Sequence, residues 1–136
     1  MDFLKNFRNR TCDIIASITA FEETKYSKVY KDVGHGSSLY FAEHFFFDTY
    51  LKDPHSANEE TIKVAFFNHK KLGMDSVIGK SEILIGEAYK SKDHVISHQW
   101  GFLQHPKKNF DQIAGFFKFS LNVARAGEPR VNLSSF

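Results

Sequence analysis

Residues 117–123, FKFSLNV, decide the fold class, because apolar and polar side chains alternate at every position. Phe117, Phe119, Leu121 and Val123 share one face, and a lysine, a serine and an asparagine occupy the other. A period of two residues is typical of a β-strand with one face in a hydrophobic core and the other in solvent. The segment therefore predicts a half-buried strand.

The same period recurs in other segments of the chain, and turn signals rich in Gly, Pro, Asp and Asn separate these segments. Residues 25–31 are polar and basic, so we expect them to be exposed or at a sheet edge. Only residues 85–90 have the pattern of a short helical turn. The seven expected strands are residues 13–21, 25–31, 41–47, 61–67, 77–85, 96–103 and 117–123. Their inward side chains predict a core between two sheets that contains Phe45, Phe47, Val64, Phe66, Phe117, Phe119 and Leu121.

Length and composition favour one β-rich domain. The chain has 136 residues, 42% of them hydrophobic and 25% charged, with fifteen Phe against three Pro. A net charge of +2 is too small to predict nucleic-acid binding by the whole protein. Several short strands at regular spacing indicate an antiparallel β-sandwich. We expect a single domain over 1–136, with an irregular N-terminal segment at 1–11, the sandwich at 12–125 and a tail at 126–136.

The sequence favours a cytoplasmic location. Cys12 is the one cysteine and cannot form an internal disulfide, which fits a reducing compartment. The chain contains no apolar run of about 18 residues that could span a bilayer, and its polar N-terminus is no signal peptide.

Combinations of residues typical of enzymes or metal sites are weak here. His94 and His98 are four residues apart, a spacing that would bring them together on a helix but not at the start of a strand. Ser37 and Ser38 lack the G-x-S-x-G context of a nucleophile and fit a turn. We therefore expect no catalytic residues, no metal and no cofactor. His94 is expected to be structural, as is Trp100, with both packing the last crossover against the sheet.

A set of matched positions gives the chain a family resemblance. The block GHGSSLYFAEHFFFD at 34–48, the triplet VIG at 77–79 and the triplet GEP at 127–129 carry it. Single positions in register are Tyr89, His94, Trp100, Leu103, Pro106, Gly115, Lys118 and Ser120. From about Cys12 to Pro129, the chain resembles the C2 domains of ferlins, and most of all their second C2 domain. The resemblance implies an antiparallel eight-stranded C2-type β-sandwich.

The first of those eight strands is missing or irregular. The seven expected strands correspond to the second through eighth strands of a C2 domain, and residues 1–11 are too few for a full strand and its loop. Either residues 3–7 form an irregular substitute, or the chain begins inside the domain. The strand that starts near Cys12 would then expose a sheet edge. This edge predicts a homodimer or strand exchange, or pairing with residues 3–7.

The resemblance also places a degenerate calcium site in the loop before Gly79. Calcium-binding C2 domains carry carboxylates at three positions of this loop, which here are Asn68, Lys70 and Ser76. Calcium needs six to eight oxygen ligands, and an ammonium group offers none. Asp75 is one place off register. We therefore expect a domain that does not bind calcium.

Basic and apolar side chains on this loop and on residues 25–31 suggest a membrane contact. The candidate lipid-binding residues are Lys25, Lys28, Lys31, Lys70, Lys71, Leu72 and Met74. In the alternative interpretation the lysines only solvate the surface, and Leu72 and Met74 pack on the domain.

The resemblance implies a non-enzymatic, calcium-independent C2 module in vesicle trafficking, exocytosis and membrane fusion. Its partners would be other domains of the same protein, protein partners or anionic phospholipid, and not nucleic acid. It would lie peripheral to a membrane, as a fragment of a larger membrane-anchored protein. The alternative is a protein–protein interaction or dimerisation module with no membrane contact.

Overall fold

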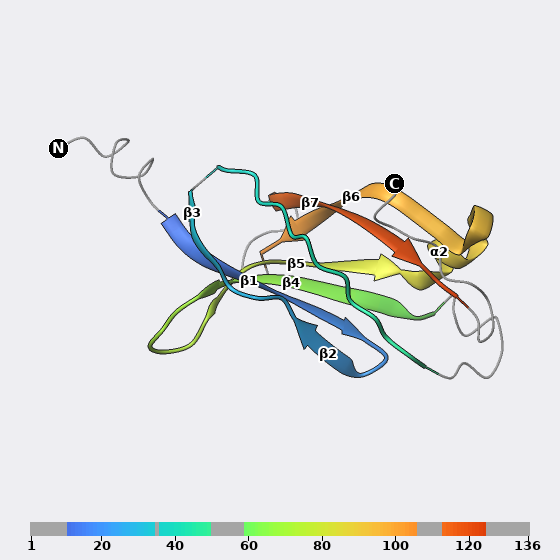
Figure 1. Cartoon of the computed structure of the whole chain (residues 1–136), viewed down its shortest axis with the longest axis horizontal. Coiled ribbons are helices and arrows are strands. Elements are labelled where there is room, and N and C mark those ends of the chain that lie inside the picture. Colours follow the sequence, from blue (N-terminus) through green and yellow to red (C-terminus); the bar gives the residue numbers. More distant parts are fainter. Residues whose placement is uncertain (1–10, 35, 50–58, 106–112, 125–136) are drawn as a thin grey trace.

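The chain forms a mostly β structure with minimal helix, a β-sandwich-type domain. The computed structural model describes residues 11–34, 36–49, 59–105 and 113–124. Within these residues, seven strands form one antiparallel sheet in the order β2-β1-β4-β5-β6-β7, with β3 also paired to β1 (Figure 1). The strands are β1 (Thr11–Ala20), β2 (Glu23–Tyr26), β3 (Tyr30–Gly34), β4 (Thr61–His69), β5 (Ser76–Leu84), β6 (Val95–Gln104) and β7 (Ile113–Asn122).

The sheet folds back on itself to make two layers. β4 pairs with β5 along its whole length, whereas β5 pairs with β6 only at Lys80 and Gln104. Beyond that single pair the sheet turns, so that β6 and β7 lie across β1, β4 and β5 (Figure 1). The layers meet where the Phe66 ring of β4 lies 5.9 Å from the Phe117 ring of β7. The expected sandwich is confirmed.

β1 is a central strand, which corrects the expectation of an open edge near Cys12. It pairs with β2 and β3 on one side and with β4 on the other. Its inner face carries small or branched side chains, Ala16, Ile18 and Ala20, which allow the opposite layer to approach. The β2–β1 turn follows directly at Phe21 and Glu22, both with positive φ. The sheet edge on this side is therefore formed by β2 and β3.

The basic segment 25–31 lies at that edge as expected, but it forms parts of two strands. Ser27 interrupts it: its amide donates to the Ala16 carbonyl (2.9 Å), and its hydroxyl accepts from the Ala16 amide (2.9 Å). This exchange turns Ser27 inward, where it is 6% exposed. The chain leaves the ladder after Tyr26 and re-enters it at Tyr30.

Residues 41–47 are extended but form no strand, which corrects the third expected strand. Inward and outward side chains alternate as predicted, with Phe41 and Glu43 among those that face the core. No ladder joins this stretch to another described strand. Side chains hold it instead: the Tyr30 hydroxyl donates to the Glu43 carboxylate (2.7 Å), and the Lys25 ammonium donates to the Phe46 carbonyl.

The hydrophobic core is centred on Ala20, Ile62, Val64 and Ile85. Of the seven side chains expected in the core, only Val64 is buried. The other six are half-buried, namely Phe45, Phe47, Phe66, Phe117, Phe119 and Leu121. No large side chain in the described ranges is completely buried. The predicted face is therefore right, but the second layer covers it incompletely.

Helix α2 (Ile85–Lys90) and the short helix η2 (Lys92–His94) connect β5 to β6. The His94 ring stacks on Tyr89 at 4.7 Å, and its Nδ1 lies 2.5 Å from the Tyr89 carbonyl oxygen. The expected structural role of His94 in this crossover is confirmed. Trp100 is 57% exposed on β6, so the expectation that it packs against the sheet is wrong. In the described part of the chain, no helix has the length and hydropathy needed to cross a bilayer.

Three expectations concern residues outside the described ranges. They are the irregular segment 1–10, the tail 126–136 and the resemblance at Pro106 and 127–129. Thr11, expected in the irregular segment, is the first residue of β1.

Candidate functional site

The loop that joins β4 to β5, residues 69–76, projects from one end of the sheet (Figure 1). The Asp75 carboxylate, at the end of the loop, bonds to two residues at its start. Asp75 Oδ1 accepts a hydrogen bond from the Lys70 amide (3.0 Å), and Asp75 Oδ2 lies 3.1 Å from His69 Nδ1. These bonds fix both ends of a tight turn that contains Gly73, at φ +88°.

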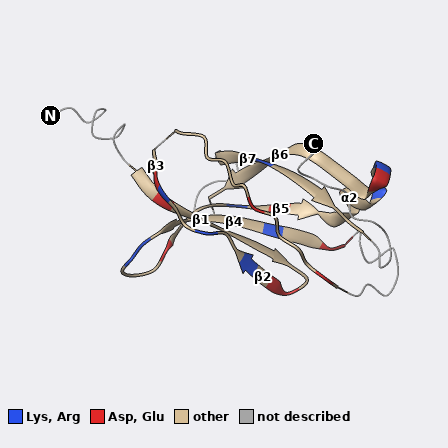
Figure 2. Cartoon of the chain, viewed as in Figure 1, with Lys and Arg blue, Asp and Glu red and all other residues tan. Residues whose placement is uncertain are grey.

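The same bonds define the electrostatics of the loop. The Lys70 amide and then the His69 ring hold the pKa of Asp75 below its ordinary value, because both stabilise the charged carboxylate. Asp75 therefore stays ionised and engaged with its own loop. The charges beside it are those of Lys70 and Lys71, both exposed (Figure 2).

Leu72 and Met74 form the apolar tip of the loop. They are 90% and 89% exposed, and so the alternative in which they pack on the domain is wrong. Neither side chain is covered by the rest of the described domain. The loop thus combines two exposed apolar side chains, Leu72 and Met74, with the two exposed lysines Lys70 and Lys71.

The three degenerate calcium positions lie at the base and mouth of this loop. Asn68 and Ser76 face each other across the β4–β5 ladder, and Lys70 follows on the exposed side. Of their side chains, only an amide and a hydroxyl could offer oxygen to a cation. Among the described residues, no group of three or more His, Cys, Asp or Glu side chains could hold a metal ion.

The lysines of β2 and β3 do not all join the loop. Lys31 is in β3, which pairs with β1 beside Asp13, and Asp13 pairs on its other side with His69. Lys31 therefore lies at the loop end of the sheet. Lys25 pairs with Ile18, five residues beyond Asp13 along β1, or about 16.5 Å at roughly 3.3 Å per residue.

Lys25 and Lys28 also have roles inside the fold. The Lys25 ammonium lies 5.0 Å from the centre of the Phe47 ring and 3.7 Å from Glu23. The Lys28 ammonium lies 5.1 Å from the centre of the Tyr30 ring. Of the seven candidate lipid-binding residues, those placed on the loop or at the loop end of the sheet are Lys31, Lys70, Lys71, Leu72 and Met74.

Sequence reasoning missed an aromatic surface on the outer face of β6 and β7, the outer aromatic face. Trp100, Phe102 and Phe116 are each more than half exposed. Phe102 contacts Phe116 edge to face at 5.6 Å, and the Lys118 ammonium lies 5.2 Å from the centre of the Trp100 ring. The sequence does contain a signal for this face: Trp100, Phe102 and Phe116 alternate along their strands with residues that point inward.

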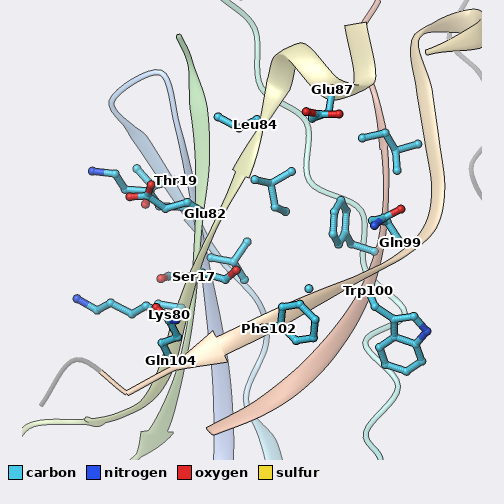
Figure 3. A pocket seen from close by; sticks show the side chains of 18 of the residues that line it. Ser17, Thr19, Lys80, Glu82, Leu84, Glu87, Gln99, Trp100, Phe102 and Gln104 are labelled. Carbon is cyan, nitrogen blue, oxygen red and sulfur yellow. The ribbon is translucent and has the colours of Figure 1, made fainter. Parts of the chain in front are cut away.

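Next to this face, an open groove of about 1250 Å³ separates β5 from β6 (Figure 3). Lys80, Glu82 and Leu84 of β5 form one wall, and Trp100 and Phe102 of β6 lie on the other. The groove exists because the two strands share only one ladder pair. Its charges are mixed, so it defines no preference for an ionic ligand.

The fold and this loop define the class, a β-sandwich-type domain with an exposed apolar and basic hairpin loop. The chain is distantly similar to myoferlin, a ferlin, from Mus musculus, with 26% identity over 93 residues. Myoferlin from Homo sapiens aligns equally, at 26% over 93 residues. The aligned stretch covers 68% of this chain but only 4% of either relative. No family model matches the chain.

Proposed function

We propose that the chain is a non-enzymatic, calcium-independent C2 module that acts in vesicle trafficking and membrane fusion. In this proposal the chain resembles the second C2 domain of ferlins. It acts by docking to proteins and by binding weakly to anionic lipid. The observation that carries the proposal is the loop at 69–76, where Leu72 and Met74 extend into solvent beside Lys70 and Lys71. The distant similarity to a ferlin supports the same assignment.

Physical estimates for the loop agree with a weak, salt-sensitive contact. Each lysine near an anionic leaflet contributes about 1 kcal/mol, and salt screens that attraction over about 10 Å at 0.1 M. Complete burial of a Leu or Met side chain contributes about 1.5–3 kcal/mol. Leu72 and Met74 would be only partly buried at an interface, so the charge term has to assist them.

The ligand set of the loop supports the proposal of calcium independence. Asp75 precedes Ser76 in the sequence, and its carboxylate is bonded to His69 and the Lys70 amide. A calcium ion would have to break these bonds and bind next to the Lys70 ammonium. At about 4 Å, repulsion from one unit of charge is about 1 kcal/mol in water and about 4 kcal/mol near a protein surface.

Sedimentation with phosphatidylserine vesicles across a salt series tests the membrane contact. We expect binding at low salt that weakens as salt rises and is unchanged by a calcium chelator. The variant Lys70→Glu/Lys71→Glu should lose most of this binding. The matched control is Lys90→Glu/Lys92→Glu, an equal charge change on exposed lysines at the opposite end of the molecule. Equal loss in both variants would contradict a contact through the loop.

The second candidate function is a protein interaction module with no membrane contact. It is favoured by the outer aromatic face, where Trp100, Phe102 and Phe116 remain exposed. Aromatic side chains of this kind are enriched at protein interfaces. No vesicle binding at low salt would decide for this alternative.

A further inference from the structure

His69 is the last residue of β4, and it contacts the carboxylate that joins the two ends of the loop. Its Nδ1 lies 3.1 Å from Asp75 Oδ2, while Asp75 Oδ1 accepts a hydrogen bond from the Lys70 amide (3.0 Å). The His69 side chain is 36% exposed. A titratable ring therefore lies where the loop leaves the sheet, next in the chain to Lys70 and Lys71 (Figure 2).

The contact with Asp75 determines which nitrogen of the ring takes up a proton. The Lys70 amide, and next the His69 ring, hold the pKa of Asp75 below its ordinary value, so its carboxylate is ionised and can only accept hydrogen bonds. Nδ1 of His69 therefore carries a hydrogen and donates it to Asp75 Oδ2. A second proton goes to Nε2, and its uptake leaves the bond to Asp75 in place.

Charged side chains from the neighbouring strands and from the loop surround this ring. Asp13 of β1 is the ladder partner of His69, so the two side chains lie on the same face of the sheet. The Asp13 carboxylate accepts a hydrogen bond from the Asp32 amide of β3 (3.0 Å). Of the residue types present here, only histidine ordinarily changes its charge between pH 5 and 8. The other charged residues described at this end of the sheet are Asp13, Lys31, Asp32, Lys70, Lys71 and Asp75.

We propose that His69 is a further residue of the membrane contact and makes that contact acid-sensitive, so that the loop binds anionic lipid more tightly when the ring takes up a proton. The inference rests on the proposed function of the loop at 69–76 and adds the regulation of that site. The partner is an anionic lipid surface, because the group that changes on the loop is a positive charge.

The added charge is large relative to the charge of the loop. Residues 69–76 contain two lysines and one aspartate, so their net charge is +1 with a neutral His69 ring and +2 with a charged one. Asp75 does not cancel this change, because its carboxylate is ionised in both states of the ring. One additional positive charge near an anionic leaflet corresponds to about a fivefold gain in affinity, which salt screens.

Sedimentation with phosphatidylserine vesicles at low salt, at about pH 7.5 and about pH 5.5, tests the inference on the two sides of the histidine range. We expect the parent chain to bind about fivefold more tightly at the lower pH. His69→Gln can still donate to Asp75 but cannot take up a proton, so it should lose this gain. His69→Arg is always charged and should bind tightly at both pH values. The matched control is His98→Gln, on an exposed histidine of β6, which should keep the gain.

Failure of this inference and failure of the proposed function give different results. If the parent chain binds equally at both pH values, or if His69→Gln keeps the gain, the role of His69 is overturned while the membrane contact stands. No vesicle binding at either pH overturns both. If circular dichroism shows that His69→Gln does not fold, His69→Arg decides: pH-independent, tight binding supports the inference, and a gain as large as that of the parent overturns it.

Discussion

The Tyr30 hydroxyl has a strongly perturbed pKa. Burial, and next the hydrogen bond to Glu43, raise the pKa of Tyr30 to about 12. We therefore expect one of the five tyrosines to ionise only at very high pH in a spectrophotometric titration. Tyr30→Phe should remove this late step, whereas Tyr26→Phe, on an exposed side chain, should leave it. Loss of the step in the second variant would refute the assignment.

The same pKa predicts how the contact stabilises the fold. Since the pKa of Tyr30 is raised above its ordinary value of 10.0, its contribution is complete below pH 10 and is lost as pH rises toward 12. Tyr30→Phe removes a hydrogen bond to a charged group, for which about 1.5 kcal/mol is the lower end of the usual range. Urea unfolding at pH 8 should show this loss of unfolding free energy, and the difference from the parent chain should shrink above pH 10.

The full set of side chains at Asn68, Lys70 and Ser76, and not Lys70 alone, determines the expected response of the loop to calcium. Calorimetric titration with calcium should give no heat, and calcium should not raise the melting temperature, because a ligand stabilises only above its dissociation constant. Lys70→Asp alone should not create a site, since Asn68 and Ser76 still lack carboxylates and Asp75 remains bonded to His69. A rise of several degrees at micromolar calcium would contradict the placement of these residues.

At the scale of elements, Gly79 determines how closely β5 approaches β6. A Cβ atom at Gly79 would lie 2.7 Å from Leu103 Cβ, whereas a Cβ at Gly115 would lie 3.6 Å from Leu103 Cδ1, an ordinary contact. Gly79→Ala should therefore lower the unfolding free energy by about 1–3 kcal/mol through overpacking. Gly115→Ala, which faces the same leucine, is the matched control and should be within about 0.5 kcal/mol of the parent in chemical denaturation.

The strands show what a side-chain pattern can and cannot predict. Residues 61–67 and 117–122 alternate, and both lie in strands, because each has a neighbouring strand. Residues 41–47 alternate as regularly and form none. The period reports which side chains face the core, and it carries no information on whether the segment joins a ladder with another strand. Ser27 illustrates a second limit, since its exchange of bonds with Ala16 depends on a residue eleven positions away.

The candidate site was predictable in composition but not in geometry. The sequence placed Lys70, Lys71, Leu72 and Met74 on one loop, and the structure keeps them there. It could not show that Asp75 closes the loop, or that Lys25 is engaged with Phe46 and Phe47. Those facts depend on which strands are neighbours, and so they appear only with the topology.

At the scale of the molecule, backbone pairing and burial are concentrated on one side of the sandwich. β4 has a ladder along both borders, to β1 and to β5, and it supplies the buried Ile62, Val64 and Ala65. β6 and β7 pair with each other, but only the pair Lys80 and Gln104 joins them to β5. The β6–β7 hairpin is therefore held to the rest chiefly by contacts across the half-buried core.

This asymmetry predicts a gradient of local stability across the domain. Amide exchange should be slowest in β1 and β4, whose amides are released only by opening of the central sheet, and at least about tenfold faster in β7. Hydrogen exchange resolved by residue in the isolated chain measures this directly. The variant Leu103→Ala provides a comparison, because Leu103 is the buried side chain of β6. Its truncation should accelerate amide exchange in β6 and β7 more than in β4. Equal protection in β4 and β7 of the parent chain would show that the two layers open as one unit, and would mean that contacts across the core hold the hairpin as firmly as a continuous ladder.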